Sequence, residues 1–179
     1  MKGEKELVKK LKSHFGFKSD LALRAELAFY HELVKIVPDL TSLRSALDES
    51  ILAKLVGKAK SVHDPRPDYF HLNDETNIGL HGEFDERAGH ETDEERLRLI
   101  AHQAGCGSER VYYYRVRANL DTAQALCKRS FYNGHAYYKM TQRGWKVLME
   151  VATYVRDCIE RMRLGEPPST SEGLDIRIF

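Results

Sequence analysis

The segment 80–86, Leu-His-Gly-Glu-Phe-Asp-Glu, places three polar side chains at alternate positions. Because strand side chains alternate with a period of two, a strand here presents His81, Glu83 and Asp85 on one face and turns Phe84 toward a core. Two carboxylates about 5 Å apart repel by roughly 3 kcal/mol in a cleft, but by less than about 1 kcal/mol in water. On a solvated face the acids need no partner, whereas in a cleft they favour a divalent cation.

Other acids and histidines lie close by in the sequence. Asp68 follows a double-proline turn, a short hairpin's distance upstream, and is a candidate third acid. His90 follows the predicted strand, and an imidazole that titrates near neutrality suits a general base or an outer ligand. We expect Mg²⁺ or Mn²⁺ at such a site. A metalloenzyme of different chemistry stays open, because zinc or manganese also accepts a mixed set such as His81, Glu83, Asp85 and His90.

Composition limits the class of protein. The chain has 179 residues, 42% hydrophobic and 31% charged, which is enough for one sizeable core. A net charge of +1 gives no overall attraction to polyanions, so any nucleic-acid site must be a local patch. Three cysteines without a CxxC pair exclude a disulfide framework and favour a reducing compartment. With no signal peptide or apolar span in view, we expect an intracellular protein of cytoplasm or nucleus, with no membrane partner.

Hydrophobic periodicity predicts the elements that position these residues. Helices are expected at 20–37, from Thr41 or Ser42 to about 57, from Thr92 to about 105, around 120–129 and at 142–164. Strands are expected at 68–72, 77–85, 111–117 and 136–140. This order predicts an α/β fold with a small mixed sheet flanked by helices. The expected parts are an N-terminal helical section (1–60), an α/β core with a long final helix (61–165) and a flexible tail (166–179).

The order of acids and histidines over residues 64–118 resembles the PD-(D/E)xK (restriction-endonuclease-like) nuclease superfamily, and within it the branch of the very-short-patch-repair endonucleases. The residues that carry this resemblance are, in chain order, Asp68, Glu83, Asp85, His90, Asp93 and Arg96. The resemblance implies a mixed sheet flanked by helices and a metal-dependent endonuclease that hydrolyses phosphodiester bonds of DNA.

By matching position, the resemblance implies that Asp68 and Glu83 hold Mg²⁺ or Mn²⁺, with Asp85 beside them. His90 or His81 would assist as a base or outer ligand. It also suggests Glu26, because many members add an acid from an early helix. Asp85 stands where the superfamily has a lysine, so a catalytically inactive nucleic-acid-binding or interaction module of the same fold is the alternative.

Basic residues beyond the acids suggest where a polyanion would bind. Arg115, Arg117, Lys128 and Arg129 are candidate nucleic-acid contacts, because phosphate contacts supply affinity without reading sequence. The apolar stripe of the predicted helix 142–164 is expected to be core or the seam of a homodimer.

Overall fold

The computed structural model describes residues 20–45, 69–85, 101–102, 104–118, 126–169 and 173–178. Five strands form the main sheet, in the order β1-β2-β3-β4-β7. Their bounds are β1 Arg44–Ser45, β2 Tyr69–Asn73, β3 Ile78–Asp85, β4 Val111–Ala118 and β7 Leu174–Ile178. β2 runs antiparallel to β1 and β3, whereas β3, β4 and β7 run parallel. The predicted α/β class with a small mixed sheet is therefore confirmed.

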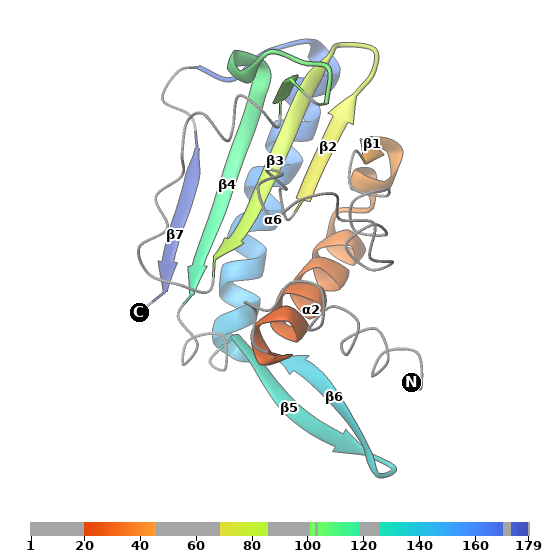
Figure 1. Ribbon diagram of the computed structural model, residues 1–179, viewed down its shortest axis with the longest axis vertical. Coiled ribbons are helices and arrows are strands. Elements are labelled where there is room, and N and C mark those ends of the chain that lie inside the picture. The colour runs from red at the N-terminus through yellow and green to blue at the C-terminus, as the bar shows by residue number, and fades with distance from the viewer. Residues whose placement is uncertain are drawn as a thin grey trace.

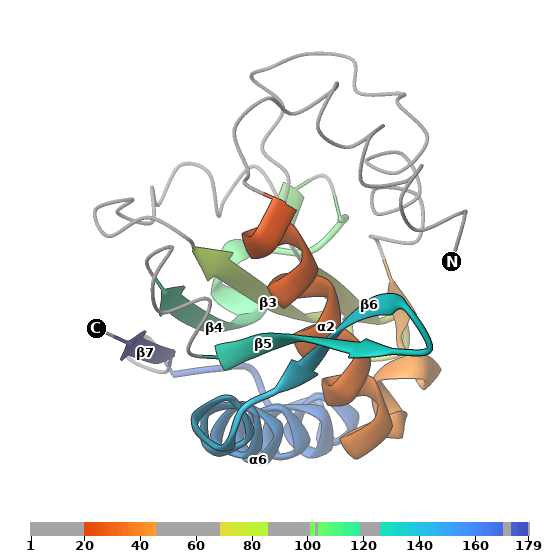
Figure 2. The same cartoon turned by 90° about the horizontal axis from the view of Figure 1, so that it is seen from below.

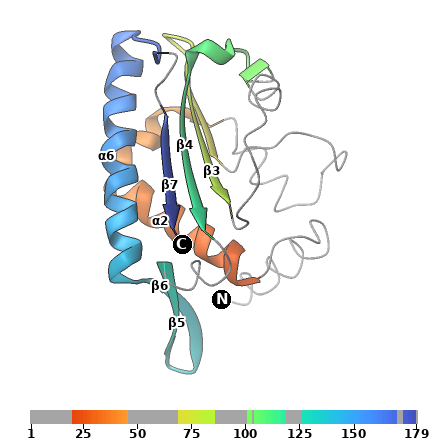
Figure 3. The ribbon, with the colours of Figure 1, turned by 90° about the vertical axis from the view of Figure 1, so that its left-hand side faces the viewer.

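Two long helices cover one face of this sheet. Helix α2 spans Asp20–Ile36 and helix α6 spans Gln142–Leu164, and both lie on the same side of the sheet (Figures 1 and 3). The predicted helix 142–164 is confirmed at both ends. Thr141 caps its start by accepting a hydrogen bond from the Gly144 amide at 3.0 Å. Gly165 ends it in the left-handed conformation, with φ 76°.

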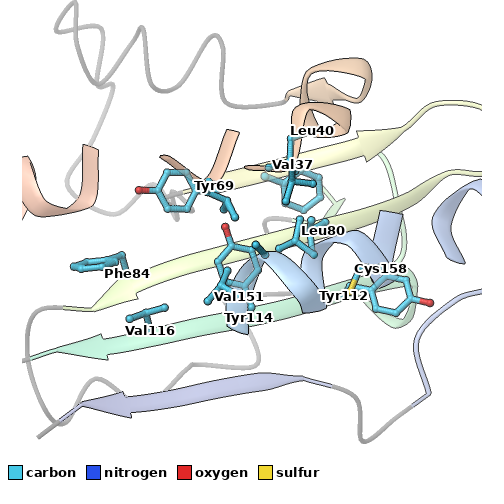
Figure 4. Packing of buried hydrophobic residues seen from close by; sticks show 14 of the residues in the cluster. Val37, Leu40, Tyr69, Leu80, Phe84, Tyr112, Tyr114, Val116, Val151 and Cys158 are labelled. Atoms are coloured by element: carbon cyan, nitrogen blue, oxygen red, sulfur yellow. The ribbon is translucent and has the colours of Figure 1, made fainter. Parts of the chain in front are cut away.

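The core lies between these helices and the sheet. Alternate residues of β3 and β4 point toward the helices, and Figure 4 shows Leu80 and Phe84 beside Tyr112, Tyr114 and Val116. Helix α6 contributes a buried stripe that includes residues 151, 155 and 159, and the Phe29 ring of α2 lies 5.8 Å from the Phe84 ring. Tyr112 and Tyr114 therefore belong to the core.

A separate two-stranded ribbon follows β4 in the chain. It is formed by β5 (Cys127–Tyr132) and β6 (His135–Met140), which pair antiparallel. Asn133 and Gly134 connect them with positive φ values of 49° and 75°, the backbone that a two-residue type I′ turn requires. The strand predicted at 136–140 is confirmed. The helix predicted around 120–129 is wrong from Cys127 onward, because the Asn-Gly turn pairs this segment with β6.

Two further predictions need correction. The tail 166–179 was expected to be flexible, but Leu174–Ile178 forms β7 and pairs in parallel with β4. The helix expected from Thr41 or Ser42 is also wrong at its start. There, Pro38–Ser42 forms the 3-10 helix η1 and β1 follows it, while the rest of that prediction lies outside the described residues. A second 3-10 helix, η2, spans Ser108–Arg110. No described helix is long and apolar enough to cross a membrane.

His71 is a polar residue on the apolar side of the sheet. It lies across from Leu80, is 4% exposed, and its ring stacks near that of Tyr30 at 6.4 Å. Within the described part of the chain, neither of its ring nitrogens has a hydrogen-bond partner. Burial lowers the pKa of His71 from 6.5 to about 4.

This burial predicts a loss of stability in mild acid. Between pH 6.5 and 4 the unfolded state binds a proton that folded His71 refuses, so the free energy of unfolding falls as pH falls through this range. From pH 7 to pH 5 the expected loss from His71 is on the order of 2 kcal/mol. Urea unfolding of the parent and of His71→Leu at both pH values measures it. An equal pH dependence in the two proteins would contradict the assignment.

Gly144 marks a close approach between α6 and the chain before β5. A Cβ at this position would lie 2.2 Å from the backbone oxygen of Leu126 and 2.9 Å from Met140 Cε. Alanine favours a helix over glycine by about 1 kcal/mol, but overpacking against backbone costs about 1–3 kcal/mol. We expect Gly144→Ala to lower the melting temperature by several degrees. Gly173→Ala is the control, because its nearest contact is 3.5 Å away and ordinary.

Candidate functional site

A buried imidazole–carboxylate pair lies on the sheet face that points away from α2 and α6. His81 Nε2 and Glu83 Oε1 are 2.7 Å apart, and the two side chains are 1% and 7% exposed. They share this face because they are two residues apart on β3, while Leu80 and Phe84, which flank the pair, point to the core. The sequence-based prediction that His81 and Glu83 lie together is confirmed.

The register of β3 with β4 brings a cation beside this pair. Glu83 is aligned with Arg115 and His81 with Tyr113 in the parallel ladder. Neighbouring strands are about 4.8 Å apart, so Arg115 and Glu83 are immediate neighbours on the same face. Arg115 is 2% exposed. His81, Glu83 and Arg115 are therefore three buried polar residues that neighbour one another on one face of the sheet, hereafter the His81–Glu83–Arg115 cluster.

Aromatic rings fix the orientation of the His81 imidazole. The Tyr113 ring lies edge-on to it at 5.3 Å, and the Phe70 ring of β2 lies at 6.2 Å in a similar arrangement. With Nε2 bonded to the carboxylate, the other nitrogen, Nδ1, is buried and has no hydrogen-bond partner among the described residues. An Nε2–H that donates to Glu83 leaves a lone pair on Nδ1, which can accept a proton or bind a metal ion.

The energetic cost of this cluster is informative. Moving charged groups out of water costs several kcal/mol each, and the attraction between partners offsets this only when the geometry is good. A buried nitrogen without a partner adds about 1–3 kcal/mol. Apolar side chains at these positions would fill the same space at a lower free-energy cost, so the cluster is a candidate for function.

The remaining predicted acids are placed only in part. Asp85 is the last residue of β3, and Glu26 lies within α2, but the structure does not describe either side chain. Asp68 and His90 lie outside the described residues. In the ranges that are described, no three His, Cys, Asp or Glu side chains gather as a metal site. The catalytic and metal-binding roles predicted for Asp68, Glu83, Asp85, His90 and Glu26 therefore stay predictions, as does the metal site.

The predicted nucleic-acid contacts divide into two groups. Arg115 and Arg117 lie on β4 of the main sheet, whereas Lys128 and Arg129 lie on β5 of the ribbon. Arg117 holds Asp175 of β7 with two contacts, Nε–Oδ1 at 3.0 Å and NH2–Oδ2 at 2.9 Å. Lys128 is exposed, and the Arg129 side chain is not described. The buried Arg115 belongs to the polar cluster, which the sequence reasoning missed.

The sequence indicates which face of β4 Arg115 lies on, but its neighbour on β3 follows only from the register of the two strands. Arg115 and Arg117 alternate with Tyr114 and Val116, so their common face was predictable. The residue of β3 that each arginine would neighbour was not predictable, because a parallel ladder can slide by two residues without changing faces.

No family model, curated protein or solved structure matches this chain in the three comparisons made.

The cluster predicts a graded response to substitution at Glu83. Glu83→Leu removes the partner of His81 and leaves Arg115 beside an apolar group, which should cost about 3 kcal/mol of unfolding free energy. Glu83→Gln keeps an oxygen that accepts from Nε2 and should cost clearly less. Urea unfolding at pH 7 measures both.

The matched control is Glu32, which pairs with Lys35 at the surface of α2. Substituting Glu32 by Leu or Gln should change stability by less than about 1 kcal/mol. Equal costs for Leu at positions 32 and 83 would show that the cluster contributes nothing to stability.

Proposed function

We propose that this protein is a metal-dependent endonuclease that hydrolyses phosphodiester bonds of DNA. The observation that carries the proposal is the His81–Glu83–Arg115 cluster, a buried carboxylate beside an imidazole with an unpartnered Nδ1 among the described residues. It lies on the strand for which the sequence predicts the metal ligands.

The order of elements supports the proposal. The antiparallel pair β2–β3 is followed by helical residues 101–102 and then by β4, parallel to β3. This is the strand, strand, helix, strand order that the sequence predicts for residues 68–117, the part of the chain that carries the resemblance. On this basis we propose a restriction-endonuclease-like fold.

The register of β2 with β3 indicates where Asp68 would lie relative to Glu83. Tyr69, the first residue of β2, lies opposite Gly82. If the ladder continued by one pair, Asp68 would lie opposite Glu83, on the same face and with Cβ atoms about 5 Å apart. Two carboxylates at that separation can share one divalent cation.

The donor chemistry fits a hard cation. Asp68, Glu83 and Asp85 would hold Mg²⁺ or Mn²⁺ through carboxylate oxygens. When bound, such an ion polarises the scissile phosphate and helps to ionise the attacking water. His81, through Nδ1, and His90 are the candidate bases that would take a proton from that water. Glu26 lies on α2, which packs on the face of the sheet opposite Glu83, so its role as an additional acid stays a sequence-based prediction and is not part of the proposed site.

Arg115 has a role that needs no metal. Arg115 is aligned with Glu83 in the ladder, so its charge would offset the repulsion between neighbouring carboxylates, which is roughly 3 kcal/mol per pair in a partly buried site. A cation held at this position also favours the approach of a phosphate toward a face that otherwise carries acids.

One observation favours the alternative, a catalytically inactive nucleic-acid-binding or interaction module of the same fold. Glu83 already binds His81, and Asp85 occupies the place of the superfamily's lysine. In that reading the cluster only stabilises the sheet. The two functions predict different outcomes for one experiment.

The experiment is plasmid cleavage in Mg²⁺ and in Mn²⁺, with and without a chelator. We expect the parent to cut, and Glu83→Gln and Asp68→Asn each to cut at least about 100-fold more slowly, because about 2.7 kcal/mol of charge stabilisation is lost. Glu32→Gln, a surface control, should cut like the parent. Cleavage that is unchanged in both site variants, or no cleavage by the parent, would reject the nuclease.

A further inference from the structure

The ribbon β5–β6 and the first turns of α6 carry charge of one sign. Residues 122–149 contain five Lys or Arg and no Asp or Glu, although the whole chain has 28 Lys and Arg against 27 Asp and Glu. Lys128, Lys139, Arg143 and Lys146 are exposed. Lys128 and Lys139 are direct partners across the ribbon. Because like charges placed opposite one another destabilise a ribbon, this pair is most favourable when an anion binds to it.

Large apolar side chains are exposed on the same segment. Phe131 and Tyr132 are 65% and 71% exposed, and Trp145 and Met149 of α6 are 39% and 45% exposed. Elsewhere in the described part of the chain, Leu164 is the one other large hydrophobic side chain that is exposed. Four of the five exposed large hydrophobic side chains among the described residues thus share one stretch of the chain with the cations, which is the composition of an interaction surface.

The ribbon exposes Phe131 and Tyr132 to solvent. It projects at the end of the molecule where β3, β4 and β7 end (Figures 1 and 3), and Figure 2 shows it from below, near α2 and the start of α6. The tight turn at Asn133 and Gly134 places Phe131 and Tyr132 next to the tip. As consecutive strand residues, they point to opposite faces of the ribbon.

We propose that this surface, residues 127–149, binds a nucleic-acid strand with unpaired bases. The lysines would contact phosphates, and the rings of Phe131 and Tyr132 would stack on bases. Bases within an intact duplex are already stacked and offer no free face to these rings. The inference rests on the proposed function and deepens it, because it names the form of substrate and the surface that holds it.

A lipid surface is the competing partner for aromatic and basic residues. It fits the ribbon less well, because a bilayer buries side chains that lie on one face, whereas Phe131 and Tyr132 point to opposite faces. A nucleic-acid strand can contact both faces, since its bases and phosphates pass around a narrow ribbon.

Fluorescence anisotropy tests the proposal, with a labelled oligo-dT of about 20 nucleotides and a duplex of equal length, in chelator so that no strand is cut. We expect the parent to bind the single strand more tightly than the duplex. The double variant Phe131→Ala/Tyr132→Ala should weaken single-strand binding at least about tenfold. The double variant Lys128→Ala/Lys139→Ala should lower the slope of log affinity against log salt by about 1.4, for two phosphate contacts.

Two controls isolate the surface. Lys35→Ala removes an exposed cation of α2, and Leu164→Ala removes an exposed apolar side chain at the far end of α6. Both should bind like the parent. Circular dichroism and thermal unfolding establish that the ribbon variants are folded.

The outcomes separate this inference from the nuclease. Single-strand binding that both ribbon variants retain, or no binding by the parent, overturns the inference. Binding to phosphatidylserine vesicles in place of oligonucleotide also overturns it and assigns the surface to lipid. Ribbon-dependent binding without plasmid cleavage leaves this inference standing and rejects the nuclease. If the parent cleaves plasmid and the ribbon variants bind single strands and cleave like the parent, the nuclease proposal stands and this inference is overturned.

Discussion

The parallel pairing of β3 with β4 is the constraint on which both faces of the sheet depend. One register aligns Leu80 with Tyr112 on the helix side, and aligns Glu83 with Arg115 on the other side. A slip of one residue would move every apolar side chain of β3 to the wrong face. The hydrophobic core on the helix side therefore fixes the position of the polar cluster on the opposite side of the sheet.

The two histidines of the hairpin β2–β3 show how different the faces are. His71 points toward α2, among apolar groups, and burial alone depresses its pKa to about 4. His81 points the other way and binds the Glu83 carboxylate at 2.7 Å. The first histidine is a neutral packing residue that limits stability in acid. His81 has a charged neighbour, Glu83, and a lone pair on Nδ1, which are what a general base or a metal ligand needs.

Sequence reasoning succeeded where a single periodicity dominated. The 3.6-residue stripe of α6 and the alternation in β3 and β4 predicted these elements within one or two residues, and they also predicted the common face of His81 and Glu83. It failed at β5, where Leu126, Cys127 and the two cations after them fit a helix and a strand equally well until the Asn-Gly turn is weighed. It also missed β7, because the alternation Leu-Asp-Ile-Arg-Ile follows a polar segment that resembles a tail. Arg115 as a partner of Glu83 depended on a register that no local pattern specifies.

The position of β7 has a consequence for association between chains. It is the outermost strand beside β4, and its salt bridge from Asp175 to Arg117 holds the two strands together from the exposed side. If β7 detached, the backbone of β4, with its run of tyrosine and valine, would become an open sheet edge. Such an edge accepts a strand from another molecule, so the Asp175–Arg117 contact also protects the protein against domain exchange and aggregation.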